Sequence, residues 1–378
     1  MIKNLILAIQ IFCSFLLLYR KRKINGIGEG IEMVISVKER IAGCLAGAAY
    51  GDALGAPTEN RTREQIFEKW GYVDQLLAPP EDVFARGNSA GQVTDDFSMA
   101  YMAIQEILEN GGRIDTQTAK QALMKWGEDE KRLDQFAGPT SKQFIYRLRG
   151  MKEDRKERFV PVNENQRASN GGAMKIGPVA CFGKGDIEKS LEIARIICGP
   201  THQNPISMSA ACAVAGAVSG ALSGKDLTGI IQDALYGAAK GEVFGRQGAI
   251  LAGPSVKKRL KLAVSMGNMA ESLSVAMDIL RRYFDCSGMA ADSVPVAFGL
   301  MAAAKGDTLA AVRAAANIGN DTDTIATIVG AVLGAYRGIG VFPKEIIDTL
   351  NIANGYELEK LAQQIAETKT KIEEERYV

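Results

Sequence analysis

Two short clusters of acidic and hydroxyl residues are the first candidates for chemistry in this sequence. They are Thr94-Asp95-Asp96 and Asp321-Thr322-Asp323-Thr324. A ligand set of carboxylate and hydroxyl oxygens suits Mg²⁺ or Mn²⁺ and disfavours zinc. Because a pair of such ions can clamp hydroxyl groups and activate water, the two clusters are typical of a metal-dependent hydrolase.

The same residues also have a plainer interpretation as helix caps. Asp and Thr are common at helix N-termini, where their oxygens accept hydrogen bonds from free N–H groups. One cap needs only one such residue, however, and adjacent carboxylates repel each other unless a cation compensates. First-turn side chains point toward the space ahead of a helix, so two helix starts can converge on one metal pair. On the residues alone, a metal site and capping with surface charge both stay open.

Three further segments carry weaker signals. Gly51–Glu59 ends a helix of very small residues and presents Glu59 beyond a Gly/Pro turn. Ser169–Met174 is a Gly-rich turn whose backbone N–H groups can cradle a phosphate, although most such turns are ordinary loops. His202 is the one histidine of the chain, and it either contacts a substrate or caps the helix that follows.

The composition excludes several other kinds of protein. The chain has 378 residues, is 47% hydrophobic and has a formal net charge of +1, so it can bury a large core and gives no electrostatic reason to bind nucleic acid. Its six cysteines have no C-x-x-C spacing, which argues against structural zinc and indicates buried thiols in a reducing compartment. Neither the phosphate-binding G-x-x-x-x-G-K-[ST] nor the G-x-S-x-G elbow of serine hydrolases is present.

The elements that must position these residues are helices. From Ser36 onward nearly every segment has helical spacing, and Ser36–Glu39 is a capping box. The Ala/Gly/Ser-rich run 205–223 predicts a buried central helix. Other helices are expected near 94–110, 187–198, 227–240, 254–266, 268–284, 293–305, 307–317, 323–337 and 343–351. With no sustained alternating run and no Pro- or Ser-rich linker, the sequence predicts one compact all-α domain over 33–355. A polar C-terminal segment, 356–378, should form a helix over 356–375.

Residues 1–32 differ from the rest of the chain. An apolar run at 5–19 precedes the basic cluster Arg20–Lys23, and it is shorter than the roughly 20 residues of a membrane span. One interpretation is a membrane anchor whose basic cluster stays inside, which would leave the domain on the cytoplasmic side. The other is an upstream start, with Met33 opening the protein. In both cases the expected location of the domain is cytoplasmic.

Taken in order, five segments resemble the ADP-ribosylglycohydrolase family: GDALGAPTE, TDD, SNGGAM, TH and GNDTDTIATIVGAVLGAYRG. The resemblance runs from about Glu39 to Gly340. That family includes ADP-ribosylarginine and ADP-ribosylserine hydrolases, dinitrogenase-reductase-activating glycohydrolases and some lens crystallins. The resemblance implies an all-α domain with two Mg²⁺ or Mn²⁺ ions in a central cleft.

The resemblance also assigns roles to residues. It implies that the metal ligands are Thr94, Asp95, Asp96, Asp321, Asp323 and Thr324. It places Glu59 beside the metals, so that Glu59 and Asp96 are the candidates for the carboxylate that activates water. The implied substrate contacts are Ser169, Asn170, Gly171, Gly172, Ala173, Met174 and His202. Asp52 matches an acidic position of the first motif that is expected to be structural.

Two positions depart from the family pattern. Phe97 stands where many relatives have a small hydroxyl residue after TDD, which is expected to alter the pocket wall. Asn320 replaces the second glycine before DTDT, at the approach to the metal loop. Neither change removes an implied ligand.

The function expected from this resemblance is metal-dependent hydrolysis of the glycosidic bond of an ADP-ribosyl group, carried by a protein or a small molecule. One alternative is hydrolysis of nucleosides or other small ribosyl N-glycosides. Another is a non-catalytic ADP-ribose-binding or crystallin-like protein, although all six implied ligands are retained. No nucleic acid is expected as a partner, and a membrane only if the N-terminal segment inserts.

Overall fold

The computed structural model describes residues 35–151 and 164–373, and Ser36 caps the first helix of this part of the chain. The hydroxyl of Ser36 accepts a hydrogen bond from the Glu39 N–H at 3.2 Å, and the Ser36 N–H donates to the Glu39 carboxylate at 2.8 Å. This confirms the predicted capping box at the start of α2 (Val37–Gly55). The segment 1–32 and its alternative start at Met33 lie outside the described residues.

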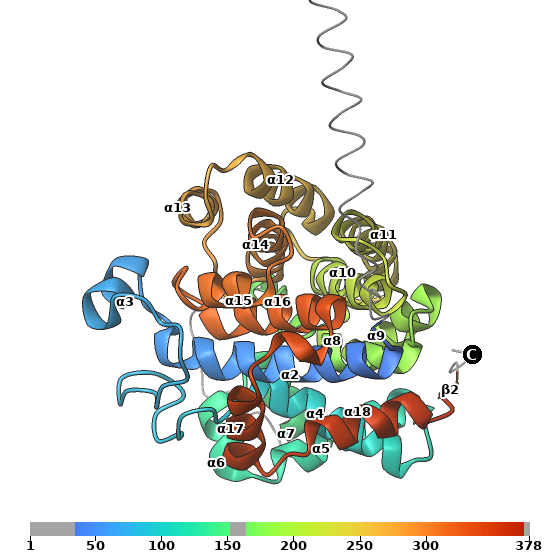
Figure 1. Cartoon of the computed structure of the whole chain (residues 1–378). Coiled ribbons are helices and arrows are strands. Elements are labelled where there is room, and N and C mark those ends of the chain that lie inside the picture. The colour runs from blue at the N-terminus through green and yellow to red at the C-terminus, as the bar shows by residue number, and fades with distance from the viewer. Residues whose placement is uncertain (1–34, 152–163, 374–378) are drawn as a thin grey trace, which may run out of the picture. The chain divides into compact units, whose positions relative to one another are not determined.

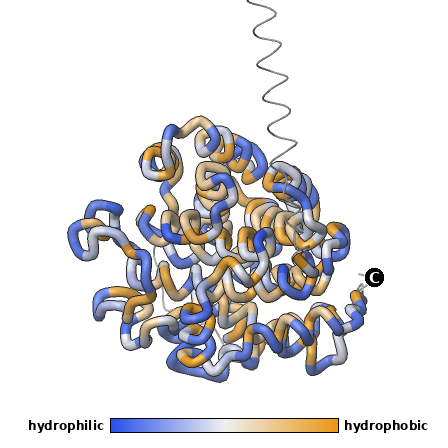
Figure 2. The backbone as a smooth tube through the Cα atoms, in the orientation of Figure 1, coloured by the Kyte–Doolittle hydropathy of each residue, from blue (hydrophilic) through white to orange (hydrophobic). Residues whose placement is uncertain are grey.

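The described part of the chain is almost entirely helical, which confirms the predicted all-α class (Figure 1). The helices not discussed individually below are α3 (Arg63–Trp70), α6 (Glu130–Phe136), α7 (Pro139–Leu148), α12 (Val256–Met269), α13 (Leu273–Tyr283), α14 (Ala290–Ala303), α15 (Thr308–Ala316) and α17 (Lys344–Asn354). Apolar residues concentrate on the inner helices and charged residues on the periphery (Figure 2). Burial of these apolar residues supplies the main driving force for the fold.

The centre of the fold is the pair α2 and α16 (Thr322–Arg337), which lie side by side in Figure 1. Glycines allow the two backbones to approach, since a Cβ atom on Gly47 would lie 2.0 Å from the carbonyl oxygen of Gly330. Gly43 faces Gly334 in the same way, and Gly55 faces Asp323, so the helices run antiparallel. The end of α2 is therefore held against the beginning of α16.

Around this pair, α10 (Pro205–Leu222) forms a buried helix packed between α9 (Ile187–His202) and α11 (Leu227–Gly245). Among the described helices, α10 alone is long and apolar enough to cross a membrane. However, 94% of its apolar window is buried inside the domain, as expected of a core helix. The predicted buried helix over 205–223 is thus confirmed.

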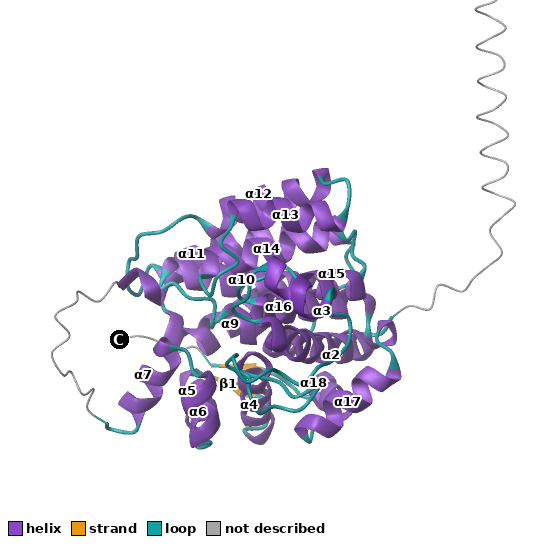
Figure 3. Ribbon diagram, turned by 90° about the vertical axis from the view of Figure 1, so that its left-hand side faces the viewer, coloured by secondary structure: helices purple, strands orange, loops and turns teal. Residues whose placement is uncertain are grey.

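The other side of the pair is covered by α4 (Asp95–Glu109) and α18 (Leu358–Glu367), and α5 (Thr116–Gly127) packs on α4. The helix expected over 356–375 is shorter than predicted, because the chain after it forms the strand β2 (Lys371–Ile372). This strand pairs in parallel with β1 (Arg113–Ile114), and the two are the strands of the described residues, drawn orange in Figure 3. Leu358, Leu361 and Ile365 are buried, so α18 belongs to the core packing.

Candidate active site

The start of α16 places the second acidic cluster inside the domain. Asp321, Asp323 and Thr324 are all buried there, with 8%, 5% and 4% of their surface exposed. Asp321 occupies the N-cap position, but its side chain does not cap the helix. One oxygen of Asp323 accepts the Thr324 N–H at 2.9 Å. Capping therefore does not explain why both carboxylates are present at this helix start.

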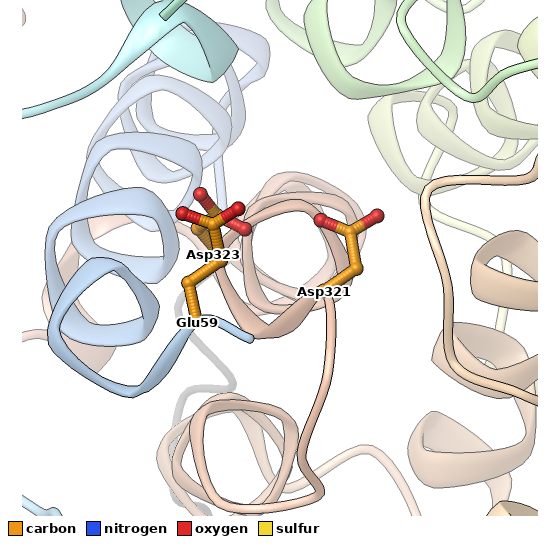
Figure 4. A group of neighbouring side chains, drawn as sticks. All are labelled: Glu59, Asp321 and Asp323. Carbon is orange, nitrogen blue, oxygen red and sulfur yellow. The ribbon is translucent and has the colours of Figure 1, made fainter. Parts of the chain in front are cut away.

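Glu59 joins this cluster from the end of α2. The one-turn helix Ala56–Thr58 turns the chain after Gly55, and Glu59 follows it. One carboxylate oxygen from each of Glu59, Asp321 and Asp323 lies within 4.8 Å of the other two. In Figure 4 the three carboxylates point to the same side of the α16 start, with Glu59 and Asp323 adjacent and Asp321 opposite. This arrangement presents several hard oxygen donors to one space.

The segment carrying Glu59 is tied directly to the loop before α16. The Asn60 N–H donates to the carbonyl of Asn320 at 2.8 Å, and the Asn320 N–H donates to the carbonyl of Arg61 at 2.8 Å. Both asparagines have left-handed backbones, with φ of 59° and 64°. Asn tolerates this conformation better than most residues, which explains how Asn320 replaces the expected glycine. The Asn60 amide also donates to Glu59 at 3.1 Å.

The first acidic cluster begins α4, where the hydroxyl of the N-cap residue Thr94 accepts the Asp96 N–H at 3.4 Å and another helix supplies further acceptors. Asp52 on α2 accepts hydrogen bonds from the N–H groups of Thr94 and Phe97, each at 2.9 Å. Asp52 thus satisfies the free donors at this helix start, in agreement with the structural role expected for it. The Thr94 hydroxyl lies 3.3 Å from Asp96 and donates to its carboxylate. The carboxylates of Asp95 and Asp96 are therefore not needed as acceptors for the N–H groups of Thr94 and Phe97.

Asp96 provides a direct test of whether a cation fits. Its Oδ1 atom is buried and has no hydrogen-bond partner within the described residues. An unpaired buried carboxylate oxygen is costly unless a cation or donor compensates it. Burial and then the charges of Asp52, Asp95 and Asp321 raise the pKa of Asp96 well above its usual range. The donor chemistry at this position therefore fits Mg²⁺ or Mn²⁺.

The electrostatics couple the carboxylates of the two clusters. Burial, followed by the charge of Asp321, raises the pKa of Glu59 to about 8. Burial, followed by the charge of Asp52, raises the pKa of Asp95 to about 8. Burial, followed by the charges of Glu59 and Asp96, raises the pKa of Asp323 well above its usual range. Carboxylates from α2, α4 and α16 are thus close enough to disfavour one another's ionisation, a strain that divalent cations relieve.

The Gly-rich turn contacts this acidic site through Asn170. Its side-chain amide donates to Asp321 at 2.5 Å and to the Ser293 hydroxyl at 2.9 Å. Gly172 then begins α8 (Ala173–Ala180). Of the six turn residues named from the sequence, Ala173 and Met174 have side chains buried in the hydrophobic core. Ser169 and Gly171 stay partly accessible.

His202 lies behind this turn. Its ring nitrogens are 3.2 Å from the Ser169 hydroxyl and 2.7 Å from the Thr201 hydroxyl, and only 1% of the residue is exposed. Burial, with a smaller effect of Lys175, lowers the pKa of His202 to about 3, so the ring is neutral. The capping interpretation of His202 is wrong, because Asn204 caps the following helix.

The sequence interpretation missed Lys175, on the first turns of α8. Only 2% of this residue is exposed, and its ammonium has no hydrogen-bond partner within the described residues. It lines an internal cavity of about 10 Å³ together with Trp126 and Met99. In the sequence, Lys175 could have been noticed as a single basic residue within the apolar run that follows the Gly-rich turn.

Phe97, the other departure from the family pattern, has a packing role. It is fully buried, and its ring lies 5.7 Å from that of Tyr356. Its side chain therefore belongs to the core beneath α4. The expectation that Phe97 alters the wall of the pocket is not met.

An all-α domain that gathers carboxylates from three helices beside a Gly-rich turn has the architecture of a hydrolase with an oxygen-only acidic site. The family model for ADP-ribosylglycohydrolase matches residues 33–374, and the chain belongs to this family. It is therefore a glycohydrolase enzyme, of the kind that acts on ADP-ribosyl groups.

Individual relatives agree with this assignment. The chain is 29% identical to the uncharacterized protein YegU of Escherichia coli K12, over 87% of this chain and 96% of that protein. It is 26% identical to human ADP-ribosylhydrolase ARH3 over 81% of this chain and 87% of the relative. It is 24% identical to ADP-ribosylarginine hydrolase Tri1 of Serratia proteamaculans over 82% of this chain and 75% of that relative. A solved ADP-ribosylglycohydrolase-related protein complex shares the fold, with a TM-score of 0.60 at 20% identity, covering 88% of this chain and 98% of that one.

Proposed function

We propose that this enzyme hydrolyses the glycosidic bond between ADP-ribose and a protein side chain, and that it requires Mg²⁺ or Mn²⁺. The observation that carries this proposal is the convergence of Glu59, Asp321 and Asp323 within 4.8 Å. The Oδ1 atom of Asp96 supports it, because this buried oxygen has no partner among the described residues and a purely structural carboxylate would have donors to both oxygens. Relatives named as ADP-ribosylhydrolase and ADP-ribosylarginine hydrolase support the substrate class.

The residues proposed to hold two divalent cations are Thr94, Asp95, Asp96, Asp321, Asp323 and Thr324. When bound, such ions orient ribose hydroxyls and stabilise the charge that develops as the leaving group departs. The protein holds these ligands ready, because α2 fixes both helix starts. Asp52 binds the beginning of α4, and Gly55 contacts the beginning of α16.

Glu59 is the proposed general base, with Asp96 as the other candidate. Glu59 lies at the edge of the acidic cluster and is only partly buried, so its carboxylate can meet a water molecule from solvent. The Asn60 amide donates to one of its oxygens and fixes the orientation of the side chain. A carboxylate held this way can take the proton of the attacking water as the glycosidic bond breaks.

The Gly-rich turn is the proposed contact for the ADP-ribose. The turn at Ser169–Gly172 has backbone N–H groups at a helix start, which suits a phosphate group. Neutral His202 hydrogen-bonds to Ser169 and fixes its hydroxyl at this turn. His202 itself is too deeply buried for broad contact, so it positions the turn.

The experiment is an assay of the full-length protein with Mg²⁺, with Mn²⁺ and with a chelator. Release of ADP-ribose is followed from arginine- and serine-linked peptides, and release of free base from nucleosides is followed in parallel. Chelator-sensitive ADP-ribose release is expected, and Asp323→Ala should abolish it while Asp348→Ala, an exposed carboxylate on α17, should not. Base release without ADP-ribose release would instead indicate a hydrolase of small ribosyl N-glycosides. Binding of ADP-ribose without any hydrolysis would indicate a non-catalytic protein.

A further inference from the structure

A groove of about 310 Å³ lies outside the acidic cluster and reaches Asn60, the residue that follows Glu59. It is lined by Asn60, Glu81, Asp82, Val83, Phe84 and Arg86. Asn60 joins the groove to the site, because its side-chain amide donates to the Glu59 carboxylate at 3.1 Å. The rest of the groove comes from the loop between α3 and α4. The proposed function leaves this groove without a role.

The wall of the groove is firmly held. Val83 and Ala85 are buried and pack with Ala56, at the turn that leads to Glu59. Phe84 lies between them and is 52% exposed. The side chain of Gln135 donates hydrogen bonds to the carbonyl groups of Phe84 and Arg86, the latter at 2.9 Å. A ring exposed on an anchored loop is available for a binding partner.

Of the charged side chains in the groove, one already has ion-pair partners and two do not. Asp82 pairs with Arg61 at 2.6 Å and lies 3.8 Å from the Lys69 ammonium. Glu81 and Arg86 have no ion-pair partner within ranges 35–151 and 164–373. Among the described residues, the groove therefore offers one carboxylate and one guanidinium without an ion-pair partner, together with an aromatic ring and an amide.

The groove and the Gly-rich turn contact different members of the acidic cluster. Asn170 of the turn binds Asp321, whereas Asn60 of the groove binds Glu59. In Figure 4, Glu59 lies next to Asp323, and Asp321 is set apart from both at the start of α16. If the ADP-ribose occupies the turn, the group attached to it extends toward Glu59 and the groove.

We infer that this groove binds the polypeptide on the leaving-group side of the glycosidic bond, so that the substrate is an ADP-ribosylated protein segment with residues of both charges. The inference rests on the proposed function. A basic residue of the segment pairs with Glu81, an acidic residue pairs with Arg86, and an apolar or basic side chain packs on the Phe84 ring. A departing nucleobase has no charges to match this pair.

The test compares two substrates that share the same ADP-ribosyl linkage. One is an ADP-ribosylated peptide with Lys and Asp residues near the modified side chain, and the other is the ADP-ribosylated free amino acid. The full-length protein is compared with the triple variant Glu81→Gln, Phe84→Ala, Arg86→Gln. The triple variant should raise the KM for the peptide roughly tenfold and leave the KM for the amino acid nearly unchanged. A change of this size is expected when a small binding hot spot is lost. The kcat values should change far less, because the acidic cluster is untouched.

A matched control and a salt series separate binding from general damage. Phe67→Ala removes an aromatic ring that is 71% exposed on α3, outside the groove, and should leave both KM values unchanged. Raising the salt concentration should increase the KM of the wild-type protein for the peptide and have little effect on the triple variant.

The failures can be told apart. Equal KM values for the two substrates in every protein would overturn the groove assignment and leave the proposed function standing, as would cleavage of the free amino acid with none of the peptide. A wild-type protein that releases ADP-ribose from neither substrate overturns the proposed function, and the groove assignment with it.

Discussion

The side-chain amide of Asn170 donates a hydrogen bond of 2.5 Å to Oδ2 of Asp321, across 151 residues of sequence. The same amide donates to Ser293, and the Asn170 N–H donates to the Gly288 carbonyl at 2.9 Å. Asn170 is therefore fixed on several sides and presents one donor to the acidic cluster. This contact orients Asp321 and couples the Gly-rich turn to the proposed metal ligands.

Removing this donor should weaken cation binding. We expect Asn170→Ala to lower the affinity for Mn²⁺, or the activity, by roughly 10- to 100-fold, as is typical when a residue that orients a metal ligand is lost. Calorimetric titration of Mn²⁺ and an ADP-ribose release assay measure the two effects. Ser293→Ala removes the second partner of Asn170 and the hydrogen bond from Ser293 to the Met289 carbonyl, but it keeps the donor to Asp321, so it should have a much smaller effect. Equal effects of the two substitutions would show that Asn170 acts through packing alone.

Substitution of Asp323 by Asn separates a metal site from ordinary capping. The change removes a charge from a crowded buried cluster, so the metal-free protein should melt at a higher temperature than the wild type. The increase in melting temperature that Mg²⁺ gives the wild-type protein should disappear. Calorimetry with and without Mg²⁺ measures both.

Asp307→Ala is the matched control for that prediction. Asp307 is a simple cap of α15 and accepts the Ala310 N–H at 3.0 Å. Its loss should cost about 1 kcal/mol of stability, with or without Mg²⁺. If Asp323→Asn behaved like Asp307→Ala, the acidic residues at α16 would be caps and the metal hypothesis would be wrong.

The local pattern of the sequence was enough to predict many of the helices, because apolar spacing and caps act over a few residues, but α3, α5, α6 and α7 were not among the expected helices. The helix expected over 94–110 is α4, and the capping box at Ser36 is present. The acidic clusters were also visible, since Asp and Thr are adjacent in the chain. Their convergence with Glu59 followed only from the family resemblance.

Contacts between distant segments could not be predicted in the same way. The paired backbones of Asn60 and Asn320 depend on how two loops meet, and nothing in either loop indicates the partner. Asp52 looked like one more acidic residue, and only the packing of α2 on α4 makes it a cap. The groove lined by Asn60 and by residues 81–84 and 86 combines residues of ordinary types, so composition alone gave no signal.

The close approach of α2 and α16 predicts a large effect of one methyl group. A Cβ atom on Gly47 would lie 2.0 Å from the Gly330 carbonyl oxygen, so Gly47→Ala must push the helices apart. We expect a loss of at least about 2 kcal/mol in the free energy of unfolding, by overpacking. Activity should fall as well, because the same helix pair holds Glu59 against Asp323. Gly340→Ala, where an added Cβ meets nothing within 4 Å, should change neither quantity in denaturant unfolding and activity assays.

The raised pKa values of the acidic cluster predict how stability depends on pH. Burial, and then neighbouring charges, hold Glu59 and Asp95 at a pKa of about 8, against roughly 4 for the same groups in an unfolded chain. Between these values the folded metal-free protein binds more protons than the unfolded chain. The contribution of these two groups to the free energy of unfolding is therefore fully present at pH 4 and is lost as the pH rises toward 8.

Thermal unfolding in the presence of a chelator should accordingly show a melting temperature that falls from pH 5 to pH 8. Cation binding requires ionised carboxylates, so the increase in melting temperature caused by Mg²⁺ should grow over the same range. Asp323→Asn should lose the Mg²⁺ effect at every pH. A melting temperature that stays constant or rises toward pH 8 in the metal-free protein would mean that Glu59 and Asp95 do not share one crowded site, because separated and solvated carboxylates are already ionised at pH 5.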